Sequence, residues 1–391
     1  MHSCRLKGGP GSSSLFGMFT EMGPFEVQSD GTSLSQREFS WNSHYSMIFI
    51  DNPVGAGYSY TETSTGYCTS TKHQVSSQLF ELMQQFYQVF PEQLENDLYI
   101  TGESYAGKYV PGLAFKIHEE NAALLKVDGG SKPQNVRIPL AGLAIGDGWT
   151  DPFSMLTAYP DMMFDIGAAD INEKAVFQEF VDLTRDYIAK GDMYNAFTVW
   201  DKMINGDIFP YPNYFHNVSG LNDYDNYMNT NSPPELGYYY RFVMSPKTRK
   251  GIHVGRNTYG GNAGTCEMNL VEDFMVSFRA EVEVLMENYK TLIYSGQLDV
   301  IIGAALTEKM LATFRWDGKE EFLMAKKSVW RVNSNDREVA GYVKQSGMFT
   351  QAVVRGAGHL VPFDQPQRAL DLINRWIQGL PFPSLVDPAK H

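Results

Sequence analysis

The stretch from Gly102 to Gly107 (GESYAG) constrains the fold of this chain more than any other feature. An apolar run at 97–101 precedes it, and a stretch of helix-like composition at 109–117 follows it. A strand that turns sharply into a helix around Gly-x-Ser lifts one hydroxyl above the sheet, where a base and an oxyanion hole can reach it. The pattern therefore makes Ser104 a candidate nucleophile at a strand-to-helix turn.

Two other interpretations fit the same residues. Gly102 to Lys108 also spell G-x-x-x-x-G-K, as in a phosphate-binding loop, but Tyr109 stands where such a loop needs Ser or Thr to hold magnesium. A glycine-rich turn with a surface serine is the third interpretation. The sequence GESYAG alone does not exclude this third interpretation, because it departs from the general hydrolase pattern G-x-S-x-G.

Two residues further along the chain support the nucleophile. In α/β-hydrolases the acid and then the histidine follow the serine in sequence. Asp299 comes just after a short apolar strand at 291–295, and His359 lies in a glycine-rich loop after a predicted strand at 349–355. Lone loop residues of these types are usually only solvated. Their order and their position after strand ends favour a triad with Ser104.

An early loop at 7–14 is a candidate for the second donor of an oxyanion hole. Its glycines, Gly8 and Gly9, allow the backbone to approach a substrate closely, and the serines after them can cap a helix. The composition is also that of a flexible linker. The apolar run at 15–19 that follows argues against a linker.

The remaining pattern predicts an α/β fold. Apolar strands are predicted at 45–50 and 139–146, and apolar residues at helical spacing predict a helix at 75–90. This alternation indicates a doubly wound, mostly parallel sheet.

The pattern changes after residue 151, where helical periodicity dominates. We predict a split core, with its first part at 1–151, a helical cap insertion at 152–244, and its second part at 245–391. A cap in this position would wall off the cleft.

Composition excludes several classes of function. A formal net charge of −13 argues against a nucleic-acid partner, and no apolar run approaches the roughly 18 residues of a membrane helix. No HExxH motif and no Cys/His cluster with zinc spacing is present, so we expect no metal or cofactor. The three cysteines, Cys4, Cys68 and Cys266, allow at most one disulfide bond.

Several blocks of the chain resemble the serine carboxypeptidases, which are exopeptidases with an α/β-hydrolase core, and above all their vitellogenic-like members. The blocks are GGPGSSSLFGMFTEMGPF from Gly8, IDNPVGAGYSY from Ile50, YITGESYAGKYVP from Tyr99, YSGQLDVIIGAALTE from Tyr294 and VRGAGHLVPFDQP from Val354, with LAIGDGWTDP from Leu143 and YFHNVSG from Tyr214. They follow the expected order over nearly the whole chain.

The resemblance implies a serine-type exopeptidase that releases C-terminal amino acids from peptides or proteins through an acyl-enzyme. Ser104 would be the nucleophile, His359 the general base, and Asp299 the residue that orients the imidazole. The backbone N–H groups of Gly9 and Tyr105 would hold the oxyanion.

The resemblance also implies a subsite for the C-terminal carboxylate of the substrate, formed by Glu103 and Glu21 with Gly8 and Lys7. Two close carboxylates share a proton, which raises the pKa of the pair. A protonated carboxyl can donate a hydrogen bond to the peptide. We therefore expect binding and cleavage to favour acid pH.

The N-terminus departs from the family. Relatives have an apolar strand ending in W-L-N or W-L-Q before the glycine loop, whereas this chain has Arg5 at the Trp position and Lys7 at the amide position. We expect that strand, and the strands that precede it in relatives, to be missing, and the loop to be poorly anchored. The amide of relatives helps to bind the terminal carboxylate. Lys7 either does so with its charge or points into solvent, and we favour solvent. Residues 1–7 are also too short and polar for a signal sequence.

Other functions stay open. An acyltransferase or esterase uses the same fold, and a catalytically impaired form would be a binding or storage protein. The resemblance further implies a lysosomal or secreted protein and a possible homodimer, with glycosylation at the Asn217 sequon if the chain enters the secretory route.

Overall fold

The computed structural model describes residues 2–126, 135–206, 208, 212–260 and 263–383. Within these residues one large sheet has the strand order β4-β1-β5-β6-β7-β10-β9-β8. From β4 to β10 neighbouring strands run parallel, and β9 and β8 are added antiparallel at one edge. The strands are β1 (His2–Leu6), β4 (Ser46–Ile50), β5 (Leu98–Glu103), β6 (Leu140–Gly146), β7 (Lys290–Gly296), β8 (Ser328–Trp330), β9 (Gly341–Ser346) and β10 (Phe349–Val354), and a separate small sheet pairs β2 (Phe25–Val27) with β3 (Leu34–Gln36).

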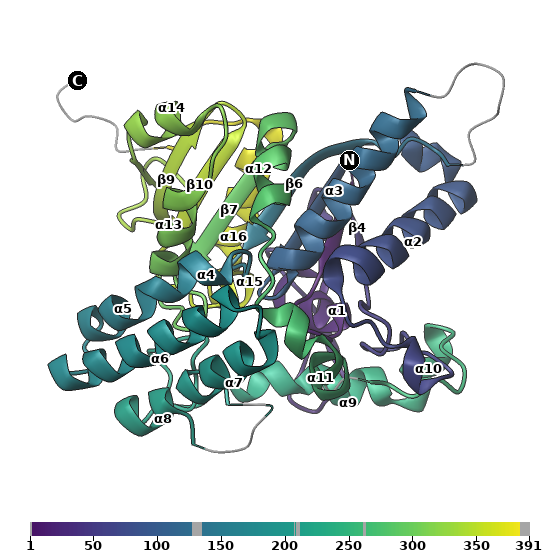
Figure 1. Ribbon diagram of the computed structural model, residues 1–391. Coiled ribbons are helices and arrows are strands. Elements are labelled where there is room, and N and C mark those ends of the chain that lie inside the picture. Colours follow the sequence, from purple (N-terminus) through teal and green to yellow (C-terminus); the bar gives the residue numbers. More distant parts are fainter. Residues whose placement is uncertain (1, 127–134, 207, 209–211, 261–262, 384–391) are drawn as a thin grey trace.

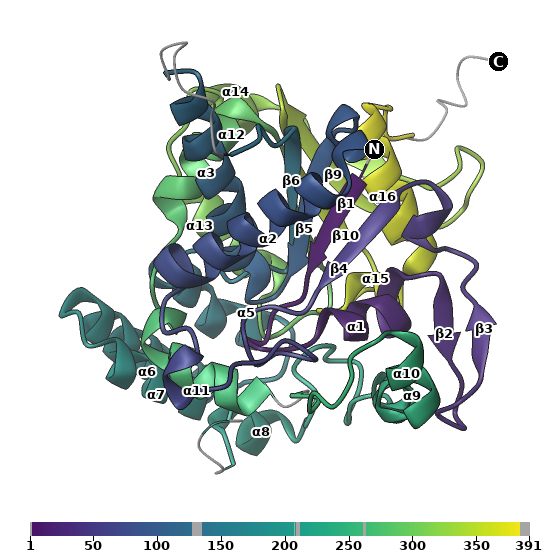
Figure 2. The same cartoon turned by 90° about the vertical axis from the view of Figure 1, so that its right-hand side faces the viewer.

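Helices cover both faces of the large sheet (Figures 1 and 2). One face carries α2 (Ser76–Val89), α3 (Ala106–Leu124), α12 (Arg279–Asn288) and α13 (Ala304–Thr313), with α14 (Lys319–Met324) near the sheet edge; the other carries α16 (Pro366–Gln378). Alternate strand residues serve the two cores. Ile293 of β7 packs in the first core, and its neighbours Leu292 and Tyr294 pack in the second. The predicted doubly wound α/β fold is confirmed.

Helices also gather at the carboxyl ends of the parallel strands (Figure 1). Between β6 and β7 they are α4 (Pro152–Met155), α5 (Tyr159–Asp165), α6 (Ile171–Ala189), α7 (Met193–Met203), α8 (Tyr214–Ser219), α9 (Tyr238–Met244), α10 (Pro246–Gly251) and α11 (Ala263–Phe274). Two of them lie beyond residue 244, and the predicted limits of the cap stay a prediction. Among the described residues, no helix combines the length and apolar character that crossing a bilayer requires.

The strand expected to be missing is present, so that prediction is wrong. All five residues of β1 pair with β4 on one side and with β5 on the other. Cys4 and Leu6 point into the first core and are fully buried. Arg5 points to the opposite face, where its guanidinium lies over the ring of Trp41. A strand needs an apolar residue only at every second position to fill one core, and this short segment meets that condition.

We predict that Leu6→Ala lowers the free energy of unfolding by about 2–5 kcal/mol, because it leaves a cavity under a central strand. Urea unfolding measures the change. Leu323→Ala is the control, since Leu323 is 50% exposed and its loss should stay within about 0.5 kcal/mol. Equal effects of the two substitutions would show that β1 is not part of the cooperative core.

Candidate active site

Ser104 occupies the sharp turn between β5 and α3. Its φ of 66° lies in the left-handed region that L-residues other than glycine rarely adopt. The turn is held by backbone hydrogen bonds, because Ser104 N–H donates to Gly146 O (3.1 Å) and Ser104 O accepts from the N–H groups of Gly107 (2.8 Å) and Trp149 (3.0 Å). A Cβ on Gly107 would lie 2.6 Å from Trp149 N. The strand, turn and helix predicted around this serine are therefore confirmed.

Asp299 and His359 meet at the same edge of the sheet. Asp299 follows β7 and His359 follows β10, and these two strands are parallel neighbours. His359 Nδ1 lies 2.8 Å from Asp299 Oδ2, and both side chains are buried. Asp299 Oδ1 accepts the N–H of Ile302 at 3.0 Å, and His359 N–H donates to Asp225 O at 2.6 Å. These bonds hold the imidazole and the carboxylate in one orientation.

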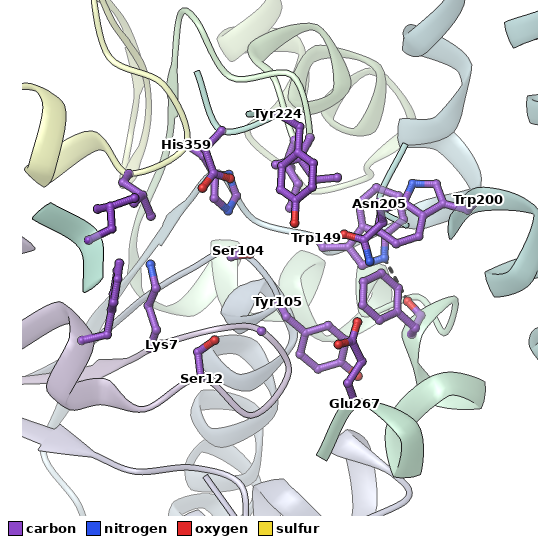
Figure 3. Close-up of a pocket in the computed structure, with 18 of the residues that line it drawn as sticks. Lys7, Ser12, Ser104, Tyr105, Trp149, Trp200, Asn205, Tyr224, Glu267 and His359 are labelled. Atoms are coloured by element: carbon purple, nitrogen blue, oxygen red, sulfur yellow. Dashed lines mark hydrogen bonds between the residues drawn. The ribbon is translucent and has the colours of Figure 1, made fainter. Parts of the chain in front are cut away.

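Ser104 and His359 line one cavity of about 290 Å³. In the close-up the ring of His359 lies directly across from Ser104 (Figure 3). Lys7 borders the cavity on one side, and on another side stand the side chains of Trp149, Trp200 and Asn205 (Figure 3). The hydroxyl and the imidazole thus face a common space large enough for part of a substrate.

Carboxylates around His359 dominate its electrostatics. Burial by itself lowers the pKa of His359, but Asp299, with its hydrogen bond, and the carboxylates of Asp225 and Glu103 outweigh burial and raise this pKa to about 9. Burial also raises the pKa of Asp225, which lines the cavity, to about 6. The raised pKa of His359 makes its imidazole a stronger base.

The early glycine loop packs against the serine turn. A Cβ on Gly8 would lie 2.5 Å from Tyr105 N and 2.8 Å from the Cβ of Ser104, so only glycine fits at this position. Gly9 has a φ of 119°, and both Gly9 and Tyr105 line the cavity. Among the described contacts, neither of their N–H groups donates to a protein acceptor. The loop is well anchored, contrary to the prediction, because β1 leads into it and Ser13 caps α1 (Ser14–Phe16) by accepting the N–H of Leu15.

Two cations, Arg5 and Lys7, each bridge the two glutamates of the predicted acidic pair. Glu103 ends β5, and Glu21 lies in the π-helical turn η1 (Gly17–Met22). Arg5 Nη2 lies 3.0 Å from Oε2 of each glutamate, and Lys7 Nζ lies 2.6 Å from Glu21 Oε1 and also contacts Glu103 Oε1. Lys7 Nζ further lies 4.8 Å from the ring centroid of Phe16. The prediction that Lys7 points into solvent is wrong, since it is 6% exposed and held by both carboxylates.

These cations reverse the direction of the pKa shift that was expected for Glu103. Burial raises the pKa of Glu103, but Lys7 and Arg5 outweigh burial and hold this pKa below its ordinary value. For Lys7, burial lowers the pKa, while Glu103 and Glu21 outweigh it and raise the pKa. The expectation of a raised pKa is therefore wrong for Glu103. Its physical reason is that two positive charges, and not a proton, balance the two carboxylates.

Several residues of the site were not assigned from the sequence. Asp225, Trp149, Trp200 and Glu267 line the cavity, and Asp147 lies beside Asp299 and His359 behind it. Asp147 and Trp149 follow β6 in the block LAIGDGWTDP, and the position of both after a parallel strand was the signal available for them.

Other predicted features lie outside the cavity. Asn217 is exposed on α8, so the sequon is accessible, and its glycosylation stays a prediction. Cys4, Cys68 and Cys266 are buried free thiols.

Known proteins are similar to this chain over almost its whole length. The profile of the family described as "Serine carboxypeptidase" matches residues 5–379. The chain is 44% identical over 375 residues to the human "Probable serine carboxypeptidase CPVL", covering 96% of this chain and 76% of the human protein. It is 38% identical over 372 residues to the vitellogenic carboxypeptidase of Aedes aegypti, covering 94% of this chain and 75% of that protein.

Among solved structures, the fold is similar to that of Kex1(delta)p, a prohormone-processing carboxypeptidase from Saccharomyces cerevisiae. The TM-score is 0.78 at 22% identity, covering 97% of this chain and 83% of the yeast one. The family profile extends over almost the whole chain, and the relatives exceed 30% identity along most of their own length. This chain therefore belongs to the serine carboxypeptidase family.

Proposed function

We propose that the cavity removes C-terminal amino acids from peptides, with Ser104, His359 and Asp299 as its triad. The observation that carries the proposal is the buried His359–Asp299 hydrogen bond of 2.8 Å beside a strained serine that lines the same cavity. Family membership supports the carboxypeptidase activity.

The reaction follows from the positions of these groups. Ser104 Oγ attacks the carbonyl of the last peptide bond, and His359 Nε2 takes the hydroxyl proton. The N–H groups of Gly9 and Tyr105 stabilise the oxyanion. His359 then gives the proton to the leaving amine, the C–N bond breaks, and an acyl-enzyme remains. Water attacks this ester with His359 again as base, which frees the shortened peptide and Ser104.

The terminal carboxylate of the substrate binds Lys7 in this proposal. Lys7 lines the cavity near Ser104, and an ammonium has three N–H donors, of which two are used by Glu21 and Glu103. The third is available to a carboxylate. Arg5 and the glutamates hold the ammonium in position. Because Gly8 has no Cβ, the loop after Lys7 can pack against the turn at Ser104. A fixed cation replaces the protonated carboxyl expected from the sequence.

The acid preference expected from the sequence required a protonated glutamate, and the lowered pKa of Glu103 removes that reason for it. Because the pKa of His359 is raised to about 9, the imidazole of the free enzyme holds a proton at acid pH and is then unable to act as a base. We therefore expect cleavage to increase from acid toward neutral pH, opposite to the sequence-based expectation.

A lysosomal or secreted location, glycosylation at Asn217 and a homodimer stay predictions from the family resemblance. The exposure of Asn217 supports the second of these.

Replacing Ser104 by Ala should reduce the release of the C-terminal residue from a blocked dipeptide by about 10³-fold or more, because the nucleophile is lost. Chromatography of the products measures it, and labelling of wild type by a serine-reactive phosphonate locates the nucleophile. Labelling without peptide cleavage would favour the acyltransferase or esterase, and absence of both in wild type would favour the binding or storage protein.

Lys7→Gln should raise KM for a blocked dipeptide about ten- to hundredfold, which is the range for losing a hydrogen bond to a charged group. The matched substrate is the same dipeptide with a C-terminal amide, whose hydrolysis should change little. Kinetics on both substrates, with thermal unfolding to check that the variant folds, provide the measurement. An equal loss on acid and amide would contradict a role for Lys7 in binding the terminal carboxylate.

Asp225→Asn should move the pH midpoint of kcat/KM to lower pH. The Asp225 carboxylate stabilises the protonated imidazole and raises the pKa of His359, so removing that charge lets His359 lose its proton at lower pH. In wild type, kcat/KM should rise as pH increases toward about 9. A wild-type profile that falls from acid to neutral pH would restore the acid preference and refute the role of His359 given above.

A further inference from the structure

Asp147 is a fully buried carboxyl group that the mechanism above does not use. It follows β6, between the strand that leads to Ser104 and the strand that leads to Asp299. Its backbone has a φ of 43°, its N–H donates to Tyr294 O at 2.8 Å, and its Oδ1 accepts the N–H of Gly296 at 2.8 Å. The backbone and the side chain of Asp147 are thus both hydrogen-bonded to the carboxyl end of β7.

The second oxygen of Asp147 has no partner among the described residues, and the carboxyl group lies beside the triad. Oδ2 is buried and accepts no N–H or O–H from any described group. Asp147, Asp299 and His359 each offer an oxygen or ring nitrogen, and these atoms all lie within 4.8 Å of one another. Two carboxyl groups this close in a buried site cannot both be ionised at low cost, so one of them keeps a proton.

The proton belongs on Asp147. Asp299 accepts the N–H of Ile302 on Oδ1 and contacts His359 Nδ1 through Oδ2, and both interactions favour its charged form. Asp147 accepts only the N–H of Gly296. Burial, with Asp299 as the next cause, holds the pKa of Asp147 well above its ordinary value.

We propose that Asp147 is a positioning residue whose protonated carboxyl donates a hydrogen bond from Oδ2 to Asp299 and thereby sets the base strength of His359. The inference rests on the proposed function of the triad. By sharing the negative charge of Asp299, this hydrogen bond weakens the hold of Asp299 on the protonated imidazole. It also fixes the Asp299 carboxyl, and through it the ring that faces Ser104.

Other ionisable groups act on the imidazole or on the carboxyl groups and hydroxyl around it, and their effects must be separated from that of Asp147. They are Glu103 at the end of β5, Arg5 of β1 and Lys7 after it, Tyr294 of β7, Asp223 and Asp225 between α8 and η7 (Pro234–Gly237), and Asp364 of α15 (Val361–Asp364). Of these, Asp225 approaches His359 from the cavity side and offers a matched comparison with Asp147, which lies behind Asp299.

The test compares Asp147→Ala, Asp147→Asn and Asp225→Asn by the pH midpoint of kcat/KM on a blocked dipeptide. The pH dependence of phosphonate labelling of Ser104 provides a second readout. Asp147→Ala removes the hydrogen-bond donor, so the full negative charge of Asp299 acts on the imidazole and raises the pKa of His359. The midpoint should move up by about one pH unit, and labelling near neutral pH should fall about tenfold.

Asp147→Asn should rescue the wild-type midpoint. An asparagine amide donates to Asp299, its oxygen accepts from Gly296, and asparagine tolerates the left-handed backbone of this position. The substitution replaces one neutral group by another, whereas Asp225→Asn removes a charge and should lower the midpoint.

Two outcomes would overturn the inference while wild type stays active. A fall of the midpoint in Asp147→Asn, matching that of Asp225→Asn, would mean that Asp147 is ionised. A wild-type midpoint in folded Asp147→Ala would mean that Asp147 only supports the backbone. If the alanine variant does not fold, the asparagine variant still decides the charge of Asp147. A wild type that neither cleaves nor labels would instead refute the proposed function, and the inference with it.

Discussion

The parallel alignment of β1, β5, β6, β7 and β10 is the constraint on which the site depends. Parallel neighbours end at the same edge of a sheet, and each of these strands passes its chain into a turn or loop at that edge. The edge therefore collects the glycine loop, Ser104, Asp147, Asp299 and His359 from segments far apart in sequence. Asp299 and His359, 60 residues apart, meet because β7 and β10 pair in register. Shifting one of these pairings by a residue would turn its side chains to the other face of the sheet.

Bringing these segments together also concentrates charge in a buried region. Five carboxyl groups, those of Glu21, Glu103, Asp147, Asp225 and Asp299, lie around one serine and one histidine. The structure balances them in three different ways. Arg5 and Lys7 neutralise the two glutamates, the imidazole lies against the carboxylates of Asp299 and Asp225, and burial raises the pKa of Asp147 so that it keeps a proton. Each charged group thus has its own compensation, which a buried charge requires.

Much of the fold was predictable because its elements carry local signals. The apolar strands β4, β5, β6, β7 and β10 and the amphipathic helix α2 lie within a few residues of their predicted ranges. The edge strands β8 and β9 were not predicted, since their half-exposed residues give a weak apolar pattern. β1 was misjudged for a related reason. Its central residue is Arg5, and a charged residue in a central strand is acceptable only where buried partners of opposite charge exist.

Local pattern and order along the chain determined the strand-to-helix turn at Ser104, the glycine loop and the candidate acid and base, because these depend on residues adjacent in sequence and on a fixed order of strands. The tertiary structure alone decided the ionisation of the site. Lys7 and Glu103 are 96 residues apart, and Asp147 and Gly296 are 149 apart, yet each pair is in hydrogen-bond contact. The pKa of a buried group depends on which charges surround it in space. That arrangement is set by strand register and burial, so the sequence predicted Glu21, Glu103 and Asp299 as residues of the site, but neither Asp147 nor Asp225, nor which of these groups keeps a proton.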